Sequence, residues 1–221
     1  MGTLLVRHAR VLATMDETRR EIADGGLFAR DGVIEAVGPT ATLPTEADEI
    51  LDASGCVVTP GLVNTHHHLF QTLTRAVPAG QDALLFGWLQ SLYPIWSRMG
   101  PDEIHSSALI GLAEMALSGC TLSSDHLYIF PNGARLEDEI DAALRLGVRL
   151  HAMRGSMSVG ESAGGLPPDA LCEPEPAILE DCIRVIDAHH DPRPGALIRV
   201  GVAPCSPFSV SPGLMRDSAL L

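Results

Sequence analysis

The sequence contains no lysine, so its 15 basic residues are all arginine, and they face 28 aspartate and glutamate residues. The formal net charge is -13 at pH 7. No cluster of arginines forms a stripe that could follow a phosphate backbone, and the acidic excess repels polynucleotides. The composition therefore excludes nucleic acid from the expected partners.

Cysteines and long apolar runs are also scarce. The five cysteines are widely spaced, and none forms a Cys-x-x-Cys pair: Cys56, Cys120, Cys172, Cys182 and Cys205. An odd number without secretory context argues against a disulfide framework. The apolar N-terminal stretch is short and interrupted by arginine, and the uncharged run from Ala83 to Trp96 is too short to span a bilayer. We therefore expect a cytoplasmic chain with reduced thiols and no membrane association.

The first 57 residues are typical of short strands joined by tight turns. Apolar and polar residues alternate in several segments: residues 3–12, 26–30, 33–37 and 49–58. Turn-forming sequences accompany them: Asp24-Gly25-Gly26, Asp31-Gly32 and Gly38-Pro39. Pairs of aspartate and glycine between alternating segments favour β-hairpins. We predict a small antiparallel β-sandwich part over residues 1–57.

The remaining residues, 58–221, alternate strand and helix patterns. Helical periodicity occurs around residues 81–96, 101–118, 136–146 and 175–190, and strand-like runs lie near residues 120–128, 147–154 and 197–204. Repeated strand and helix units are typical of parallel sheets and of α/β barrels. A complete (β/α)8 barrel needs about 250 residues, whereas 221 − 57 = 164 remain here. The predicted fold class is therefore α/β, with about the first four units of an incomplete (β/α)8 TIM-type barrel.

Three successive histidines end the apolar run of the segment PGLVNTHHHLFQ, residues 60–71. If the preceding CVV segment is a buried strand, alternate residues share a face, so His66 and His68 project together and His67 points away. Lone histidines are usually surface or satisfied core residues, but three in succession at the end of an apolar run favour a metal site. His66 and His68 are therefore candidate metal ligands, and on spacing alone an ordinary structural role for them stays open.

Other polar residues follow the later predicted strands, which in a barrel share one face. Arg154 either donates a forked pair of hydrogen bonds to an oxygen atom of a bound ligand or forms a structural ion pair, and both readings stay open. Cys205, Ser206 and Phe208 are predicted to line the substrate pocket, although Cys205 also suits a small buried position.

Two further pairs of residues have a structural interpretation. Asp125 and His126 either orient a metal ligand or satisfy the core and cap helices, and the second role is favoured slightly. Trp88 and Trp96 are expected in the core or at a subunit contact rather than beside a substrate.

Several segments of the chain resemble the amidohydrolase superfamily: PGLVNTHHH, DHLYIFPNGAR, RGSMSVG, GGLPPD and APCSPFSVS. Within it, the chain is most similar over its whole length to bacterial 8-oxoguanine deaminases of the chlorohydrolase and cytosine-deaminase-like branch. The resemblance implies one divalent metal per site, zinc first and iron as the alternative, in a (β/α)8 barrel beside a small β-sandwich. With this resemblance, we predict His66 and His68 as metal ligands. Such a metal lowers the pKa of a water molecule to about 7 and so provides a nucleophile.

The reaction implied by the resemblance is the conversion of 8-oxoguanine to urate and ammonia. Gln71 would then pair with the purine edge, because an amide both donates and accepts hydrogen bonds; an ordinary loop glutamine is the alternative. Other small heterocycles remain open, through a guanine, pterin or cytosine deaminase or an s-triazine chlorohydrolase or aminohydrolase. A protein of another class, a non-catalytic binding or scaffold protein, also remains open.

The sequence departs from the superfamily pattern in its length. The resemblance implies further metal ligands on strands five, six and eight and a glutamate after strand five, and this chain has none of those strands. No catalytic residue is identifiable here, and the general acid/base is expected beyond residue 221. We expect an N-terminal fragment that is inactive and poorly soluble alone, and a homo-oligomer when full length.

Overall fold

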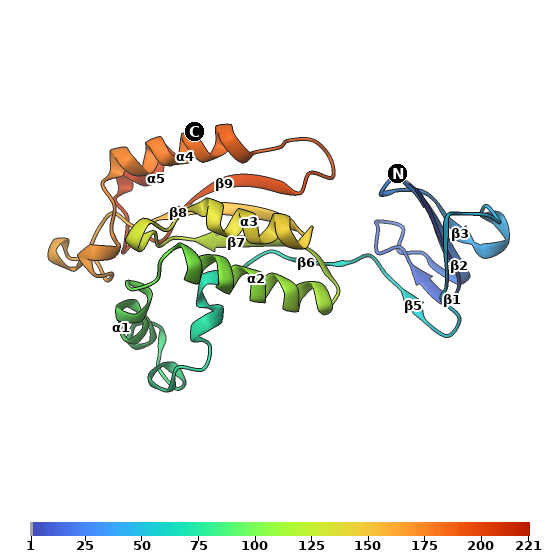
Figure 1. The fold of residues 1–221 in the computed structure, drawn as a ribbon, viewed down its shortest axis with the longest axis horizontal. Helices are drawn as coiled ribbons and strands as arrows, with labels where there is room; N and C mark the ends of the chain where they lie inside the picture. The colour runs from blue at the N-terminus through green and yellow to red at the C-terminus, as the bar shows by residue number, and fades with distance from the viewer. Residues whose placement is uncertain (1) are drawn as a thin grey trace. The chain divides into compact units, whose positions relative to one another are not determined.

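The alternating segments at the start of the chain form one mixed sheet (Figure 1). In this computed structural model, which describes residues 2–221, the strand order is β3-β2-β1-β4, and β5 pairs with β1. The strands are β1 (Thr3–Ala13), β2 (Glu21–Arg30), β3 (Val33–Pro39), β4 (Glu49–Asp52) and β5 (Val57–Val58). Pairing is antiparallel for β1 with β2 and for β2 with β3, but β4 and β5 run parallel to β1. The prediction of an antiparallel unit is therefore wrong for β4 and β5, because the chain crosses over after β3 instead of turning back.

The two aspartate and glycine signals in this sheet have different structural causes. Asp31 and Gly32 form the predicted turn between β2 and β3, with φ angles of 50° and 82°. In contrast, Gly25 and Gly26 lie inside β2, where a Cβ atom on Gly26 would be 2.4 Å from the carbonyl oxygen of Val6. The predicted turn at residues 24–26 is wrong, since glycine there permits the close approach of β1.

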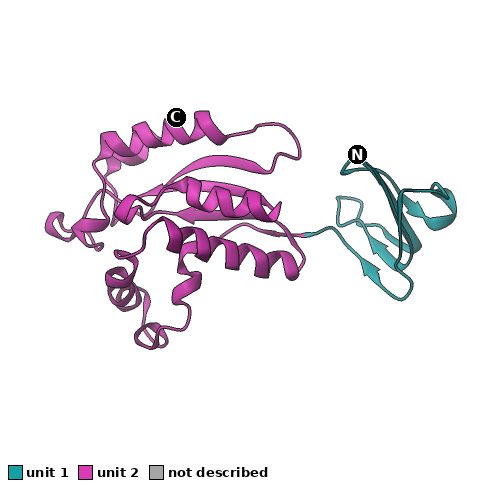
Figure 2. Cartoon of the chain, in the orientation of Figure 1, with its two compact units in different colours: residues 1–61 teal, residues 62–221 magenta. Residues whose placement is uncertain are grey.

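The strand that leads to the histidines is not the one predicted. Val57 and Val58 form β5, whose ladder pairs them with Val11 and Leu12 of β1. The chain divides into compact units at residues 1–61 and 62–221, so the boundary lies beyond the expected residue 57 (Figure 2). The strand before the histidines is instead β6 (Leu62–Asn64).

The second unit is an α/β unit around a parallel sheet with the order β6-β7-β8-β9 (Figure 1). Its other strands are β7 (Cys120–Leu127), β8 (Arg149–Ser156) and β9 (Ile198–Pro204). The helices are α1 (Leu85–Trp96), α2 (Pro101–Leu117), α3 (Leu136–Leu146), α4 (Glu175–His189) and α5 (Pro212–Ser218). Short 3-10 helices lie in the loops of the chain: η1 (Thr40–Thr42), η2 (Leu69–Thr74), η3 (Pro78–Gly80), η4 (Pro131–Gly133), η5 (Glu161–Ala163) and η6 (Asp169–Leu171). These bounds match the predicted helices and strands closely, except that α1 begins later than residue 81.

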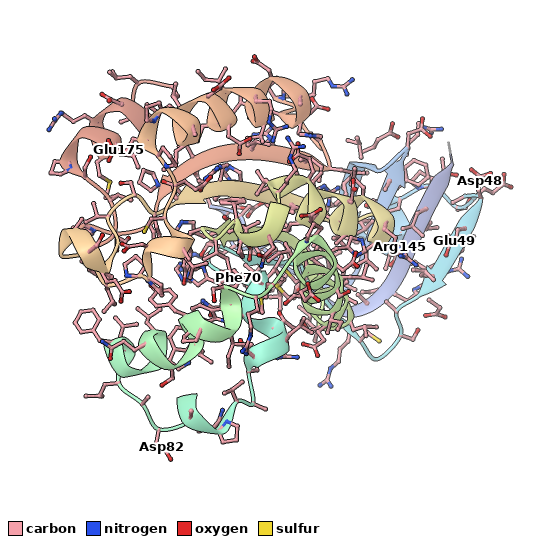
Figure 3. All side chains as sticks on the ribbon, turned by 60° about the vertical axis from the view of Figure 1, so that its left-hand side comes forward. Asp48, Glu49, Phe70, Asp82, Arg145 and Glu175 are labelled. Carbon is pink, nitrogen blue, oxygen red and sulfur yellow. The ribbon has the colours of Figure 1, made fainter. Side chains whose placement is uncertain are left out.

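The core of the second unit lies between one face of the sheet and its helices. In β8, the buried Leu150, Ala152 and Arg154 alternate with the partly exposed His151 and Met153, so only one face is covered. Phe70 of η2, labelled in Figure 3, belongs to this core and is 1% exposed. No helix within residues 2–221 is long and apolar enough to cross a membrane.

Candidate metal centre

The histidine segment passes over the carboxyl end of β7. Residues 65–68 have no regular structure, and they connect β6 to η2, which begins at Leu69. The rings of His66 and His68 lie edge to face, with 4.9 Å between their centroids. The structure thus brings the two predicted ligands side by side, although they project from a loop rather than from a strand.

The backbone of β7 selects the tautomer of His68. Its Nδ1–H donates a hydrogen bond to the carbonyl oxygen of His126 at 2.9 Å, which leaves the Nε2 lone pair free. Burial lowers the pKa of His68 below its ordinary value, outweighing the hydrogen bond to His126. A neutral imidazole with one nitrogen tied to a carbonyl is the form in which histidine binds metals.

His67 points away from its two neighbours, as predicted. Its Nδ1 lies 3.7 Å from Oδ1 of the buried Asp125, on the covered side of the sheet, and has no hydrogen-bond partner among the described residues. Asp125 Oδ1 also accepts a hydrogen bond from the backbone N–H of Leu69 at 2.5 Å. Asp125 therefore caps the start of η2, and this contact also ties it to the segment that carries the histidines.

His126 and Tyr128 stand on the open side of the sheet, beside His68. Their rings lie 5.3 Å and 5.2 Å from that of His68, measured between centroids. The Nε2–H of His126 donates to the carbonyl oxygen of Ala203 at 2.8 Å, and burial lowers the pKa of this imidazole. Burial also raises the pKa of Tyr128, so its hydroxyl stays protonated and accepts a hydrogen bond from Gln71 Nε2 at 3.3 Å.

A cavity of about 320 Å³ lies against these side chains. It is lined by His66, His68, Gln71, Leu85, Trp88, Leu89, Tyr93, His126, Tyr128, Cys205, Ser206 and Phe208. Most of the predicted site residues thus share one cavity, and its volume is in the range of small-molecule sites. Trp88, expected in the core, packs on Trp96 at 5.2 Å between ring centroids but also forms part of the wall.

The predicted pocket residues of the β9 loop are held in place by local contacts. The N–H of Cys205 donates to the carbonyl oxygen of Ser156 at 3.0 Å, and burial raises the pKa of its thiol, so the sulfur is neutral. The hydroxyls of Ser206 and Ser209 are 2.7 Å apart. Phe208 is 40% exposed, and its ring lies edge to face with that of Phe86, with 5.5 Å between the centroids.

Arg154 is not part of this group. Its guanidinium donates to Asp181 Oδ2 at 2.9 Å and to both carboxylate oxygens of Glu173 at 2.9 and 2.8 Å, and its side chain is 1% exposed. It also lies over the ring of Phe130, 3.9 Å from the centroid. Of the two readings of Arg154, the structure shows the ion pair, because Arg154 points to the covered face of β8.

The two histidines fit part of the donor set of a metal site. Within residues 2–221, no three or more His, Cys, Asp or Glu side chains are placed together to hold a metal ion. The free Nε2 of His68 and the adjacent ring of His66 fit two positions of a tetrahedral zinc site, whose remaining positions need other donors. Another cavity, of about 340 Å³ in the first unit, includes Leu12, Leu27 and Val37 in its lining but no histidine or cysteine.

We predict that Gly155→Ala destabilises the second unit by about 1–3 kcal/mol, because overpacking displaces neighbouring groups. A Cβ atom on Gly155 would lie 2.6 Å from His126 Nε2, the Leu127 carbonyl oxygen and Tyr128 Cβ. The free energy of unfolding is measured in urea with tryptophan fluorescence as the signal, since both tryptophans of the sequence belong to the second unit.

The matched control for Gly155 is Gly87→Ala in α1. The nearest atom to a Cβ there is Ala83 Cβ at 3.9 Å, so the added methyl group has room. Alanine also has the higher helix propensity. Gly87→Ala should leave stability unchanged or raise it, and an equal loss in both variants would contradict the crowding argument.

The fold and site define a class of protein: an α/β protein whose parallel strands carry histidines and aromatic residues at their carboxyl ends, around one cavity. The chain belongs to the amidohydrolase family, whose model matches residues 57–220. It is 44% identical in sequence to an 8-oxoguanine deaminase of Pseudomonas aeruginosa, and the match covers 89% of this chain and 44% of the relative. The predicted resemblance is confirmed.

Solved structures of other hydrolases are similar to the chain. A triazine hydrolase from Arthrobacter aurescens, 30% identical, has a TM-score of 0.94 and covers 100% of the chain with 50% of its own length. An atrazine chlorohydrolase from Arthrobacter aurescens TC1 complexed with zinc, 29% identical, has a TM-score of 0.89, covering 98% of the chain with 50% of its own. The chain spans about half the length of these proteins.

Proposed function

We propose that the protein represented by this chain is a metal-dependent hydrolytic deaminase of a purine-like heterocycle, with 8-oxoguanine as the first candidate and urate and ammonia as products. The observation that carries the proposal is the pair of adjacent histidine rings beside a cavity of about 320 Å³. The identity of 44% to an 8-oxoguanine deaminase supports the choice of substrate.

His66 and His68 would hold the metal, with zinc as the first candidate and iron as the second. The zinc in the similar chlorohydrolase structure supports zinc. When bound, the metal supplies an activated water to attack the carbon that bears the leaving amine. The chain's own contribution is to keep His68 neutral and oriented, through its hydrogen bond to the His126 carbonyl oxygen.

Gln71 and the aromatic wall would bind the substrate. Gln71 Nε2 donates to the Tyr128 hydroxyl at 3.3 Å, which leaves the amide oxygen as an acceptor and the hydroxyl hydrogen as a donor. A lactam edge presents both an N–H and a carbonyl oxygen, so it complements these two groups. Trp88 and Phe208 on the cavity wall offer apolar surface to a planar ring.

The sheet of the second unit would form the first half of a (β/α)8 barrel. In residues 2–221, β6 and β9 each have one neighbouring strand, and Leu62 and Val63 of β6 are 61% and 58% exposed. Parallel sheets are normally covered on both faces and not left with long open edges. Further strands would supply the missing ligands and the general acid/base, in keeping with the greater length of the relatives.

A triazine substrate is the second candidate. The triazine hydrolase structure with a TM-score of 0.94 favours it, because a triazine, like a purine, is a nitrogen-rich aromatic ring. A non-catalytic binding protein is the alternative of another class. Within residues 2–221, no three His, Cys, Asp or Glu side chains are placed together to hold a metal ion. This favours the binding protein only for the 221-residue chain taken alone.

The test compares the 221-residue chain with the polypeptide obtained by extending it through its native reading frame, called here the extended polypeptide. Ammonia release is assayed with 8-oxoguanine, guanine, isoxanthopterin and an aminated s-triazine, together with the bound-metal content. We expect ammonia only from the metal-loaded extended polypeptide, and fastest with 8-oxoguanine. Inertness on every compound contradicts the deaminase, and full activity of the 221-residue chain contradicts the half barrel.

A further inference from the structure

Two carboxyl groups lie buried beneath the histidine segment, on the covered side of the sheet. Asp125 of β7 is 0% exposed and Glu139 of α3 is 1% exposed. No hydrogen-bond donor among the described residues reaches Asp125 Oδ2 or either carboxylate oxygen of Glu139. Buried polar atoms without partners are rare in folded proteins, so a pair of them in contact needs an explanation.

A shared proton explains the pair. Two adjacent buried carboxylates cannot both be charged, because desolvation and mutual repulsion each disfavour the second charge. Burial, followed by the charge and hydrogen bonding of Asp125, raises the pKa of Glu139 well above its usual value. Protonated Glu139 then serves as a hydrogen-bond donor to Asp125, whose Oδ2 otherwise has no partner among the described residues.

The end of β7 is connected to the histidine segment by contacts on both sides. Asp125 Oδ1 accepts from the Leu69 N–H at 2.5 Å, on the covered side. The His126 carbonyl oxygen accepts from His68 Nδ1 at 2.9 Å, and the His126 N–H donates to the His67 carbonyl oxygen, also at 2.9 Å. The position of residues 67–69 therefore depends on the Asp125 side chain and on the adjacent strand.

We propose that Asp125 is a positioning residue for the metal-binding histidines, and that Glu139 fixes its carboxylate by donating one hydrogen bond to it. The inference rests on the proposed function, because it assigns a role relative to the metal. Asp125 touches neither metal nor substrate in this role. It acts through the backbone of Leu69, next to His68, and through the side of His67, whose Nδ1 is 3.7 Å away.

The first test is metal affinity, measured in the extended polypeptide by competition with a chromogenic zinc chelator. Asp125→Ala should weaken zinc binding about 10–100-fold, the usual effect of removing a group that orients a ligand. Glu139→Met, which keeps the side-chain volume without a donor, should weaken it in the same direction. Glu139→Gln keeps a donor toward Asp125 and should stay within about twofold of the unmodified protein, since the hydrogen bond is preserved.

The control for a purely structural effect is Ile140→Ala, next to Glu139 on α3 and 1% exposed. It creates a cavity in the same helix and should lower the melting temperature, but it should leave zinc affinity unchanged. The positioning role is overturned if Asp125→Ala binds zinc within twofold of the unmodified protein. It is also overturned if the zinc affinity of Asp125→Ala falls no further than that of Ile140→Ala. If Asp125→Ala does not fold, Glu139→Gln and Glu139→Met make the same comparison.

The second test is infrared spectroscopy of the unmodified protein at neutral pH. A carbonyl stretch of a protonated carboxyl group should be present and should disappear in Glu139→Gln. Its absence overturns the carboxyl pair. If the unmodified extended polypeptide binds no metal, the proposed function fails together with this inference, whereas metal binding and ammonia release that Asp125→Ala leaves intact overturn this inference alone.

Discussion

Replacing His68 with alanine should reduce zinc affinity of the extended polypeptide by more than about 100-fold, beyond the loss typical of a group that only orients a ligand. The reason is geometric. His68 is the histidine whose Nδ1 is tied to a backbone carbonyl, which leaves its Nε2 free, and its ring lies edge to face with that of His66. Deaminase activity should fall with metal content, and chelator competition together with metal analysis of the purified protein measures both.

His67→Ala is the matched control, because it removes an imidazole from the adjacent position in the same segment. His67 points to Asp125 and not to the other two rings, so its loss should change zinc affinity less than tenfold, below the range for orienting groups. Equal losses in His67→Ala and His68→Ala would show that the whole segment had been disturbed. Unchanged zinc binding in His68→Ala would contradict the proposed metal centre.

The helices of the second unit were predictable from local signals. Helix α3 begins and ends where the sequence predicts, with three acidic residues in its first turn and Gly147 at its end with a φ angle of 68°. The same type of signal misled at residues 24–26, because a glycine required by a neighbouring strand is indistinguishable in sequence from a glycine in a turn. Likewise, pairing decides that Val57 and Val58 belong to the first sheet, and pairing is not a local property.

The candidate site was predictable where neighbouring residues carry the signal. The alternation of His66 and His68 needs only the local chain direction, whereas Trp88 of helix α1 and Tyr128 after β7 line the cavity through the packing of separate elements. An apolar helix face predicts burial, but it does not distinguish a core from a cavity wall. The contact between Asp125 and Glu139 joins a strand to the helix that follows it, and no spacing rule within one element reveals it.

Arg154→Met should destabilise the second unit by about 3 kcal/mol, the lower end of the range for breaking a buried ion pair. The substitution leaves the carboxylates of Glu173 and Asp181 without the guanidinium that binds both of them. Their side chains are 26% and 27% exposed, so water partly replaces the lost hydrogen bonds and the upper end of the range is not reached. Tryptophan fluorescence during urea unfolding reports this loss.

Arg193→Met provides the comparison for Arg154, because Arg193 also pairs with an aspartate, at 2.7 Å from Asp191, but its side chain is 83% exposed. An exposed pair contributes at most about 1 kcal/mol, so the stability of this variant should be close to that of the unmodified protein.

The KM of Arg154→Met for the substrate separates the two readings of Arg154. In the extended polypeptide, a structural ion pair predicts that Arg154→Met lowers stability but leaves the KM of the folded fraction unchanged, because the guanidinium lies on the face of β8 turned away from the cavity. A raised KM with unchanged stability would instead show that Arg154 contacts the substrate, and the ion pair would not be its function.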